Sequence, residues 1–301
     1  MTVPSFALVL SLASQQGTDS VVARAKEAIR PLTDSIVLHN AGYFPIGFGG
    51  GVRDLTPFQG QHWISLSLFF TNPPVDLSKP TFMMYLPVGD SLIPIGVAYI
   101  RRISGSVPLP ADLAGTPTEW HSHAFCRSIP GEGQALADGP DDCKARGGTP
   151  APNQIAMVHT WTVANPDGPY AHDNPALPFI ATGLKPPAHP MRDDRLFGVA
   201  LGETYGAKLP TAHRIERDAA RAGTQQPLQS PRVALRALVP KLREADRAGD
   251  RTKFDELRKE TIDAWSALVV QYHALAATPE LKARFDVELE QALGNVSHHH
   301  M

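Results

Sequence analysis

Four histidines between residues 60 and 160 have the side chain and the spacing that a metal site needs. They are His62, His121, His123 and His159. His121 and His123 are two positions apart, so in a strand both side chains project from the same face and can bind one ion. His62 and His159 would complete a set of three or four imidazole nitrogens, which suits a divalent zinc, copper or iron ion. The four residues therefore predict a histidine-cluster metal site.

Two other interpretations of these histidines stay open. Buried polar side chains are usually hydrogen-bonded, so His62 beside Trp63 and His159 near Trp161 can equally be core residues bonded to the backbone. The same side chains could line a pocket for a small organic ligand. Cupins also use a His-x-His pair with a later histidine, but the Gly, Glu and Pro residues of the cupin pattern are missing here. The candidate functions are thus a metal-binding protein or metalloenzyme, a non-catalytic small-molecule binding module, and a structural or partner-binding protein.

The carboxylates around the histidines add weaker candidates. In the long loop that carries the His-x-His pair, Glu119 and Glu132 could act as a general base toward a metal-bound water. Asp173 beside His172 could bind or support the ion, but an Asp-Asn-Pro segment is typical of a turn, which we favour. The glycine run over residues 47–51 lacks the Lys-Ser/Thr of a phosphate-binding loop, so we exclude that function.

The composition indicates a globular protein without affinity for nucleic acid. Of the 301 residues 43% are hydrophobic and 19% are charged, and the net charge is −2, so nothing drives binding to nucleic acid or anionic membranes. No apolar run reaches the roughly 18 residues of a membrane span. The segment 6–13 looks like the apolar part of a signal peptide, although no basic residues precede it, and predicts a periplasmic or secreted protein. We exclude the terminal residues His298–His300 from the site.

The two cysteines test the predicted export. Cys126 and Cys143 lie in one Gly/Pro-rich stretch with sixteen residues between them. In an oxidising compartment they would form a disulfide that stabilises the fold by about 3 kcal/mol, with Cα atoms roughly 4.4–6.8 Å apart. In a cytosolic protein they would be two unrelated thiols. If the chain is exported, we expect the bridge.

Hydrophobic periodicity predicts an α+β fold in two regions. A leading helix over residues 18–41, divided or kinked at Pro31, packs on a mainly antiparallel sheet or small barrel. A C-terminal helical hairpin or bundle follows, with Trp265, Leu268 and Tyr272 on its buried face. The regions are a β-rich histidine-cluster domain, residues 18–185, and a helical region, residues 190–294. The predicted strands are 63–69, 81–86, 93–100 and 155–163, the predicted helices are 233–248, 252–277 and 279–293, and residues 105–152 and 165–190 are predicted to be loop or coil.

A series of short motifs resembles those of a group of uncharacterised exported bacterial proteins. The motifs are Ala41-Gly42-Tyr43, Gly60-Gln61-His62-Trp63, Val75-Asp76-Leu77-Ser78-Lys79-Pro80 with Met84-Tyr85, His159-Thr160-Trp161, Asn165-Pro166-Asp167-Gly168, Tyr170-Ala171 and Asn174-Pro175. Their order and spacing cover residues 20–180, and Thr160 replaces the valine that is usual between His and Trp. The resemblance implies the fold of this half, export and the position of the site, but no reaction.

Overall fold

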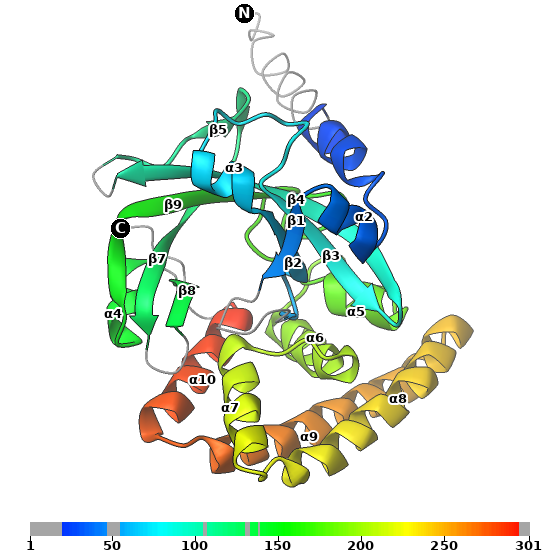
Figure 1. Ribbon diagram of the computed structural model, residues 1–301. Helices are drawn as coiled ribbons and strands as arrows, with labels where there is room; N and C mark the ends of the chain where they lie inside the picture. Colours follow the sequence, from blue (N-terminus) through cyan, green and yellow to red (C-terminus); the bar gives the residue numbers. More distant parts are fainter. Residues whose placement is uncertain (1–19, 47–54, 105–106, 130–132, 138, 295–301) are drawn as a thin grey trace, which may run out of the picture. The chain divides into compact units, whose positions relative to one another are not determined.

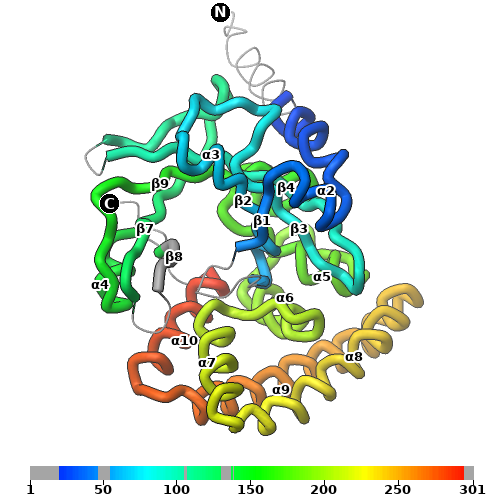
Figure 2. Tube along the Cα trace, in the orientation of Figure 1, coloured from blue at the N-terminus to red at the C-terminus, as the bar shows by residue number. Residues whose placement is uncertain are grey.

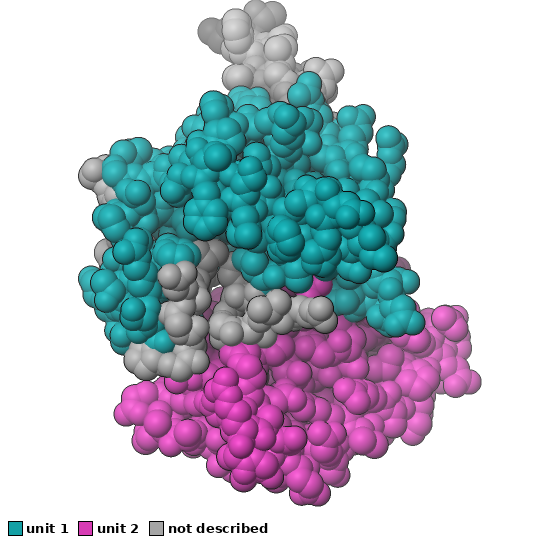
Figure 3. Space-filling model, in the orientation of Figure 1, with its two compact units in different colours: residues 1–46, 62–172 teal, residues 47–61, 173–301 magenta. Residues whose placement is uncertain are grey.

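A computed structural model describes residues 20–46, 55–104, 107–129, 133–137 and 139–294 (Figure 1). The chain forms two compact units, which are coloured separately in Figure 3. Unit 1 comprises residues 1–46 and 62–172, and unit 2 comprises residues 47–61 and 173–301. Four features named from the sequence lie outside the described residues: the segment 6–13, the glycine run 47–51, Glu132 and His298–His300.

Unit 1 is built on a curled antiparallel sheet whose strands lie in the order β1-β2-β3-β4-β9-β7-β8. In sequence order the strands are β1 (Tyr43–Ile46), β2 (Gln61–Ser65), β3 (Phe82–Val88), β4 (Ser91–Ser104), β7 (His121–Ile129), β8 (Gly133–Ala137) and β9 (Thr149–Trp161). A separate pair is formed by β5 (Asp112–Leu113) and β6 (Thr116–Pro117). Together with the helices described below, this sheet confirms the predicted α+β class.

The leading helix covers one face of this sheet (Figure 2). It is divided at Pro31, as predicted, into a helical segment over residues 20–29 and α2 (Ser35–Asn40). Asp34 begins α2, because its Oδ1 accepts hydrogen bonds from two amides of the first turn at 2.9 Å. Buried apolar residues of both helical segments pack against alternate residues of the strands: Val21, Ala25, Ile29 and Leu38 against Trp63, Tyr85, Val97, Tyr99 and Val158.

The strand predicted over residues 63–69 is wrong in its second half. β2 ends at Ser65 and α3 (Leu66–Thr71) follows directly. Asn72 ends α3 in the left-handed region, with φ of 50°, and donates its N–H to the Leu68 carbonyl. A short apolar run fits helical spacing as well as strand alternation, so the pattern alone did not separate the two.

Residues 105–152, predicted as a loop, contain β5 to β8 and the helix α4 (Pro140–Ala145). The prediction failed because β7 departs from regular pairing: its register shifts between Ala124 and Cys126 and again between Cys126 and Ile129. Bulges of this kind interrupt the alternation by which a strand is recognised. The last strand, β9, accordingly begins at Thr149 rather than at residue 155.

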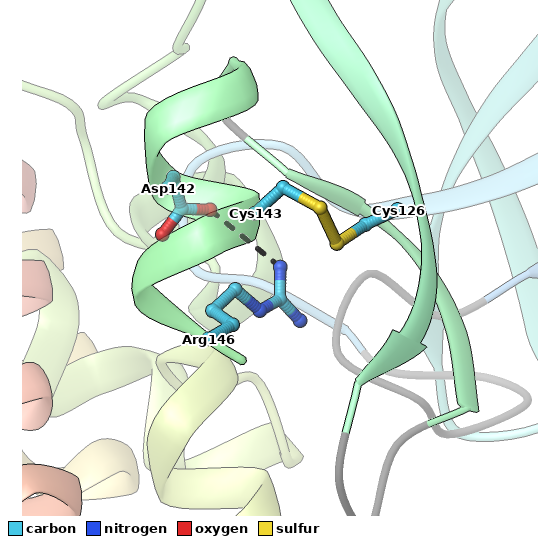
Figure 4. Close-up of a disulfide and its surroundings, with 4 residues drawn as sticks. All are labelled: Cys126, Asp142, Cys143 and Arg146. Atoms are coloured by element: carbon cyan, nitrogen blue, oxygen red, sulfur yellow. Dashed lines mark ion pairs between the residues drawn. A yellow bond between two sulfur atoms is a disulfide. The ribbon is translucent and has the colours of Figure 1, made fainter. Parts of the chain in front are cut away.

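A disulfide fastens this irregular region (Figure 4). Cys126 of β7 and Cys143 of α4 are bridged, with Cα atoms 5.6 Å apart, as predicted for an exported chain. Both cysteines are buried in a small apolar cluster with Ala124, Ile129 and Ala137. The bridge therefore holds α4 against the strand that begins with His121.

Unit 2 is helical in the described residues. Its helices are α5 (Leu177–Thr182), α6 (Arg192–Tyr205), α7 (Pro210–Arg221), the 3₁₀ turn η1 (Gln226–Leu228), α8 (Gln229–Ala248), α9 (Arg251–Leu275) and α10 (Pro279–Ala292). The last three confirm the helices predicted after residue 233, and Trp265, Leu268 and Tyr272 are buried as expected. The prediction of coil up to residue 190 is wrong at α5. No helix among the described residues has both the length and the apolar character of a membrane span.

A buried charged network joins four helices of unit 2. Arg232 of α8 donates two hydrogen bonds to Glu216 of α7, at 2.8 and 2.9 Å, and one to the Tyr272 hydroxyl of α9 at 2.7 Å. Tyr272 in turn donates to Glu203 of α6 at 2.7 Å. Burial raises the pKa of Glu203, while Lys208 and Arg232 lower it. The network serves the packing of the helices.

Candidate metal centre

Five histidine rings of unit 1 lie next to one another. Four are the residues predicted from the sequence, and the fifth is His172 in the segment after β9. Ring centroids are 5.5 Å apart for His62 and His159, 5.1 Å for His159 and His121, and 4.9 Å for His121 and His123. The centroid of His172 is 4.4 Å from that of His121 and 5.5 Å from that of His159. We refer to these five residues as the histidine cluster.

The histidine cluster lies on the face of the sheet opposite the leading helix. Cross-strand partners share a face, and the register pairs Phe82 with Ala98 and Ala98 with His159. Residues adjacent to these along the strands, such as Val97 and Val158, face the core under the helix. His62 belongs to the histidine face, since its ring contacts that of Phe82 at 5.9 Å.

Small residues on β4 allow distant strands to bring their side chains together. β2 and β9 are separated by β3 and β4, which is about 14 Å along a flat sheet. The rings of His62 and His159 are nevertheless 5.5 Å apart, so the sheet curls around this face. Ala98, next to His159, is fully buried, and a Cβ at Gly96 would lie 2.8 Å from the Thr160 carbonyl oxygen. A side chain at Gly96 would collide with the backbone of β9, so the close approach of β4 and β9 depends on this glycine.

β7 supplies the His-x-His pair, as the spacing predicted. His121 lies opposite Met157 of β9 and His123 lies opposite Ile155, so both imidazoles project from the same face as His159. The exposed surface of His123 is 7%, and His121 is half-buried. The pair therefore reaches the histidine cluster from a strand next to β9, on the side away from β4.

Two side chains of β9 hold the segment that carries His172. The Nε1–H of Trp161 donates to the Ala171 carbonyl at 2.7 Å, and Nδ1 of His159 lies 2.6 Å from the His172 carbonyl oxygen. The amide of Trp161 also donates to the Pro169 carbonyl at 2.9 Å. These bonds fold residues 165–172 back along β9, and so they bring the His172 ring beside His121.

Three of the imidazoles are spaced for one metal ion. Ligand nitrogens of His121, His123 and His172 all lie within 4.8 Å of one another. Zinc–nitrogen bonds of about 2.0–2.1 Å place the nitrogens of a tetrahedral site roughly 3–4 Å apart. The nitrogens are thus close enough that the three residues could hold one ion. Among the described residues this converging group consists of histidines alone.

His159 presents a buried lone pair. Its Nδ1 must carry the proton that is donated to the His172 carbonyl, so in the neutral ring Nε2 is an acceptor. Nε2 is buried and has no hydrogen-bond partner within the described part of the chain. Burial lowers the pKa of His159 well below its usual value, and the nearby His62 and His172 lower it further. A ring of this kind stays neutral and available as an acceptor.

His62 is the deepest member of the histidine cluster. Its exposed surface is 1%, and burial lowers its pKa from the ordinary 6.5 to about 3, with smaller effects of His123 and His172. Metal ligation and hydrogen-bond acceptance both require neutral imidazole. The environment of the histidine cluster therefore favours the form that either function needs.

The carboxylates named from the sequence are not part of the converging group. Glu119 is exposed. Asp173 follows His172 directly, and its Oδ1 accepts a hydrogen bond from Gln59 Nε2 at 3.0 Å within unit 2. The sequence thus pointed to the correct segment through Asp173 but did not predict His172. The signal in the sequence was a histidine directly after the Tyr170-Ala171 motif.

Comparisons with known proteins found no match for this chain. No protein-family model, no curated protein and no solved structure aligns with it. The motif resemblance therefore stays a prediction. The geometry of the histidine cluster is what supports a conclusion about function.

Proposed function

We propose that the protein is an exported metal-binding protein, with His121, His123 and His172 as the ligands of one divalent ion. The observation that carries this proposal is the approach of three imidazole nitrogens to within 4.8 Å of one another on a curled sheet. An all-imidazole ligand set suits zinc, copper and iron, and we expect zinc first because a tetrahedral three-histidine site is one of its usual arrangements.

His159 and His62 belong to the same proposed site as neighbours of the three ligands. A metal-ligating residue is commonly held by hydrogen bonds from outside the ligand set, and losing such a bond weakens metal binding. His159 holds the proposed ligand His172 in this way, because its Nδ1–H donates to the backbone carbonyl of His172. Its buried Nε2 is then available to accept a hydrogen bond from a water or ligand on the ion.

The alternative of purely structural histidines fits His159 less well. A structural histidine in a core is expected to have both ring nitrogens hydrogen-bonded, since an unsatisfied buried acceptor costs about 1–3 kcal/mol. Within the described residues Nε2 of His159 has no such bond. A non-catalytic pocket for an organic ligand stays the second candidate. Three protein ligands are typical of catalytic zinc sites and four of structural ones, which favours a metal with an accessible position.

The disulfide supports the exported location. Disulfides persist in oxidising compartments and are rare in the cytosol. Here both cysteines are buried, and the bridge holds α4 against β7, the strand of two proposed ligands. The resemblance to exported bacterial proteins points the same way, so we propose the periplasm or the exterior as the site of function.

Metal analysis tests the proposal. The protein would be purified without a nickel column from a variant with serine at His298–His300, so that the terminal histidines add no metal. We expect about one equivalent of zinc by elemental analysis after dialysis, and none in His121→Ala or His172→Ala. His39→Ala is the matched control, because His39 is an exposed residue of α2 in the same unit, and its Nδ1 bonds the Ser35 carbonyl within that helix. Absence of metal from the starting protein, or equal metal in all variants, would contradict the proposal.

A further inference from the structure

We propose that the ion in the histidine cluster binds a small carboxylate as its exchangeable ligand. This inference rests on the proposed function and adds the chemical class of the molecule that the site takes. It follows from the charge of the ligand set, the gradient of burial across the histidine cluster and the apolar side chains on the same face.

The ligand set leaves the charge of the ion uncompensated. Ligating histidines are neutral, so three of them around a divalent ion give a centre of charge +2. No Asp or Glu of the described residues joins the converging group. Asp173, the carboxylate next to His172 in the sequence, accepts a hydrogen bond from Gln59. An anionic oxygen ligand would neutralise half of this charge, which a neutral ligand of the same shape cannot do.

Two of the proposed ligands, His121 and His172, are the members of the histidine cluster that solvent reaches most easily. His62 and His159 are each 1% exposed, whereas His121 and His172 are half-buried. A molecule from solvent therefore meets the ion from the side of His121 and His172. His62 and His159 stand behind the ion, and imidazole rings carry no negative charge that would repel an anion.

Apolar side chains on the same face make the anion preference stronger. Trp161 lies 5.6 Å from His159 by ring centroids, Phe82 lies 5.9 Å from His62, and Met157 lies opposite His121. All three are buried. Charges attract more strongly where water is excluded, which strengthens the preference for an anion. Met157 lies opposite His121, on the entry side, and is the apolar neighbour for the carbon part of an organic acid, so the ligand class is a small carboxylate.

Acetate and acetamide provide a matched pair of probes. They have the same shape and differ in charge. The protein, with serine at His298–His300, would be loaded with Co²⁺, and its visible spectrum titrated with each probe at constant ionic strength. We expect a saturable change with acetate and an affinity for acetamide at least about tenfold lower. Similar affinities for the two probes, or no response to acetate, would overturn the inference.

A variant with a negatively charged ligand tests whether the charge of the centre causes the preference for acetate. His123→Asp replaces a neutral ligand by an anionic one, so we expect Co²⁺ to stay bound while the affinity for acetate falls by at least about tenfold. His172→Asp makes the same change at another ligand, and it serves if the first variant does not fold. An unchanged acetate affinity in a variant that holds Co²⁺ would overturn the charge argument. Cobalt that binds but ignores acetate refutes this inference alone, whereas cobalt that does not bind refutes the proposed function and this inference with it.

Discussion

Replacing Trp161 by phenylalanine should weaken metal binding without removing a ligand. The change deletes the Nε1–H that donates to the Ala171 carbonyl at 2.7 Å, directly before His172. Phenylalanine keeps an aromatic ring against Gly96 of β4, where the indole packs so closely that a Cβ at Gly96 would lie 3.4 Å from it. The lost bond holds the residue next to a proposed ligand, and losing a supporting bond of this kind typically weakens metal binding by about 10- to 100-fold, so zinc affinity should fall by this factor.

Competition with a chelator would measure this loss, and Tyr85→Phe is the matched control. Tyr85 is buried in the same unit and donates from its hydroxyl to the Leu32 carbonyl at 2.6 Å, on the face away from the histidine cluster. Both variants should lower the free energy of unfolding of the metal-free protein by a similar 1–3 kcal/mol or so, but only Trp161→Phe should lower zinc affinity. Equal zinc affinity in both variants would refute the idea that Trp161 positions His172.

Three further predictions concern stability. The metal-free protein should lose stability as pH falls from 6.5 toward 3, because the unfolded chain takes up a proton at His62 with the ordinary pKa of 6.5, while the folded chain does so only near 3. Urea unfolding at pH 7.5 and 5.5 should show this loss, which His62 makes as steep as about 1.4 kcal/mol per pH unit. Burial also lowers the pKa of His159, which acts in the same direction. A pH-independent free energy of unfolding would contradict it. Replacing both Cys126 and Cys143 by serine should lower the free energy of unfolding by about 3 kcal/mol, measured in the same way, and an unchanged value would show that the bridge adds nothing. Arg232→Met should cost about 3–5 kcal/mol, because it removes the cation that pairs with the buried Glu203 and with Glu216 and leaves Lys208 alone near Glu203; a loss below about 1 kcal/mol would mean that Glu203 is held neutral.

The sequence predicted the regular elements of the fold because their patterns are local. The helices after residue 233 have caps and an apolar face within the segment, and the β3–β4 hairpin follows from two apolar runs joined at Gly89. β7 was missed because bulges interrupt its alternation, and α3 was read as strand because six residues fit either period.

The candidate site was predicted only in the part that spacing can reveal. His121 and His123 share a face by alternation alone, so their pairing was accessible from the sequence. The approach of His62 to His159 depends on the curl of the sheet over Ala98, which no local pattern contains. His172 was missed because hydrogen bonds from His159 and Trp161 set its position, and these join residues ten or more positions apart.

X-ray absorption at the zinc edge tests the central claim most directly. The zinc-loaded protein, with serine at His298–His300, should show three imidazole nitrogens at about 2.0–2.1 Å and the multiple scattering typical of histidine rings. The His172→Ala variant should show two imidazoles, with oxygen in place of the third, and a lower zinc affinity. A spectrum without histidine scattering, or one that His172→Ala leaves unchanged, would contradict the assignment of His121, His123 and His172 as the metal ligands.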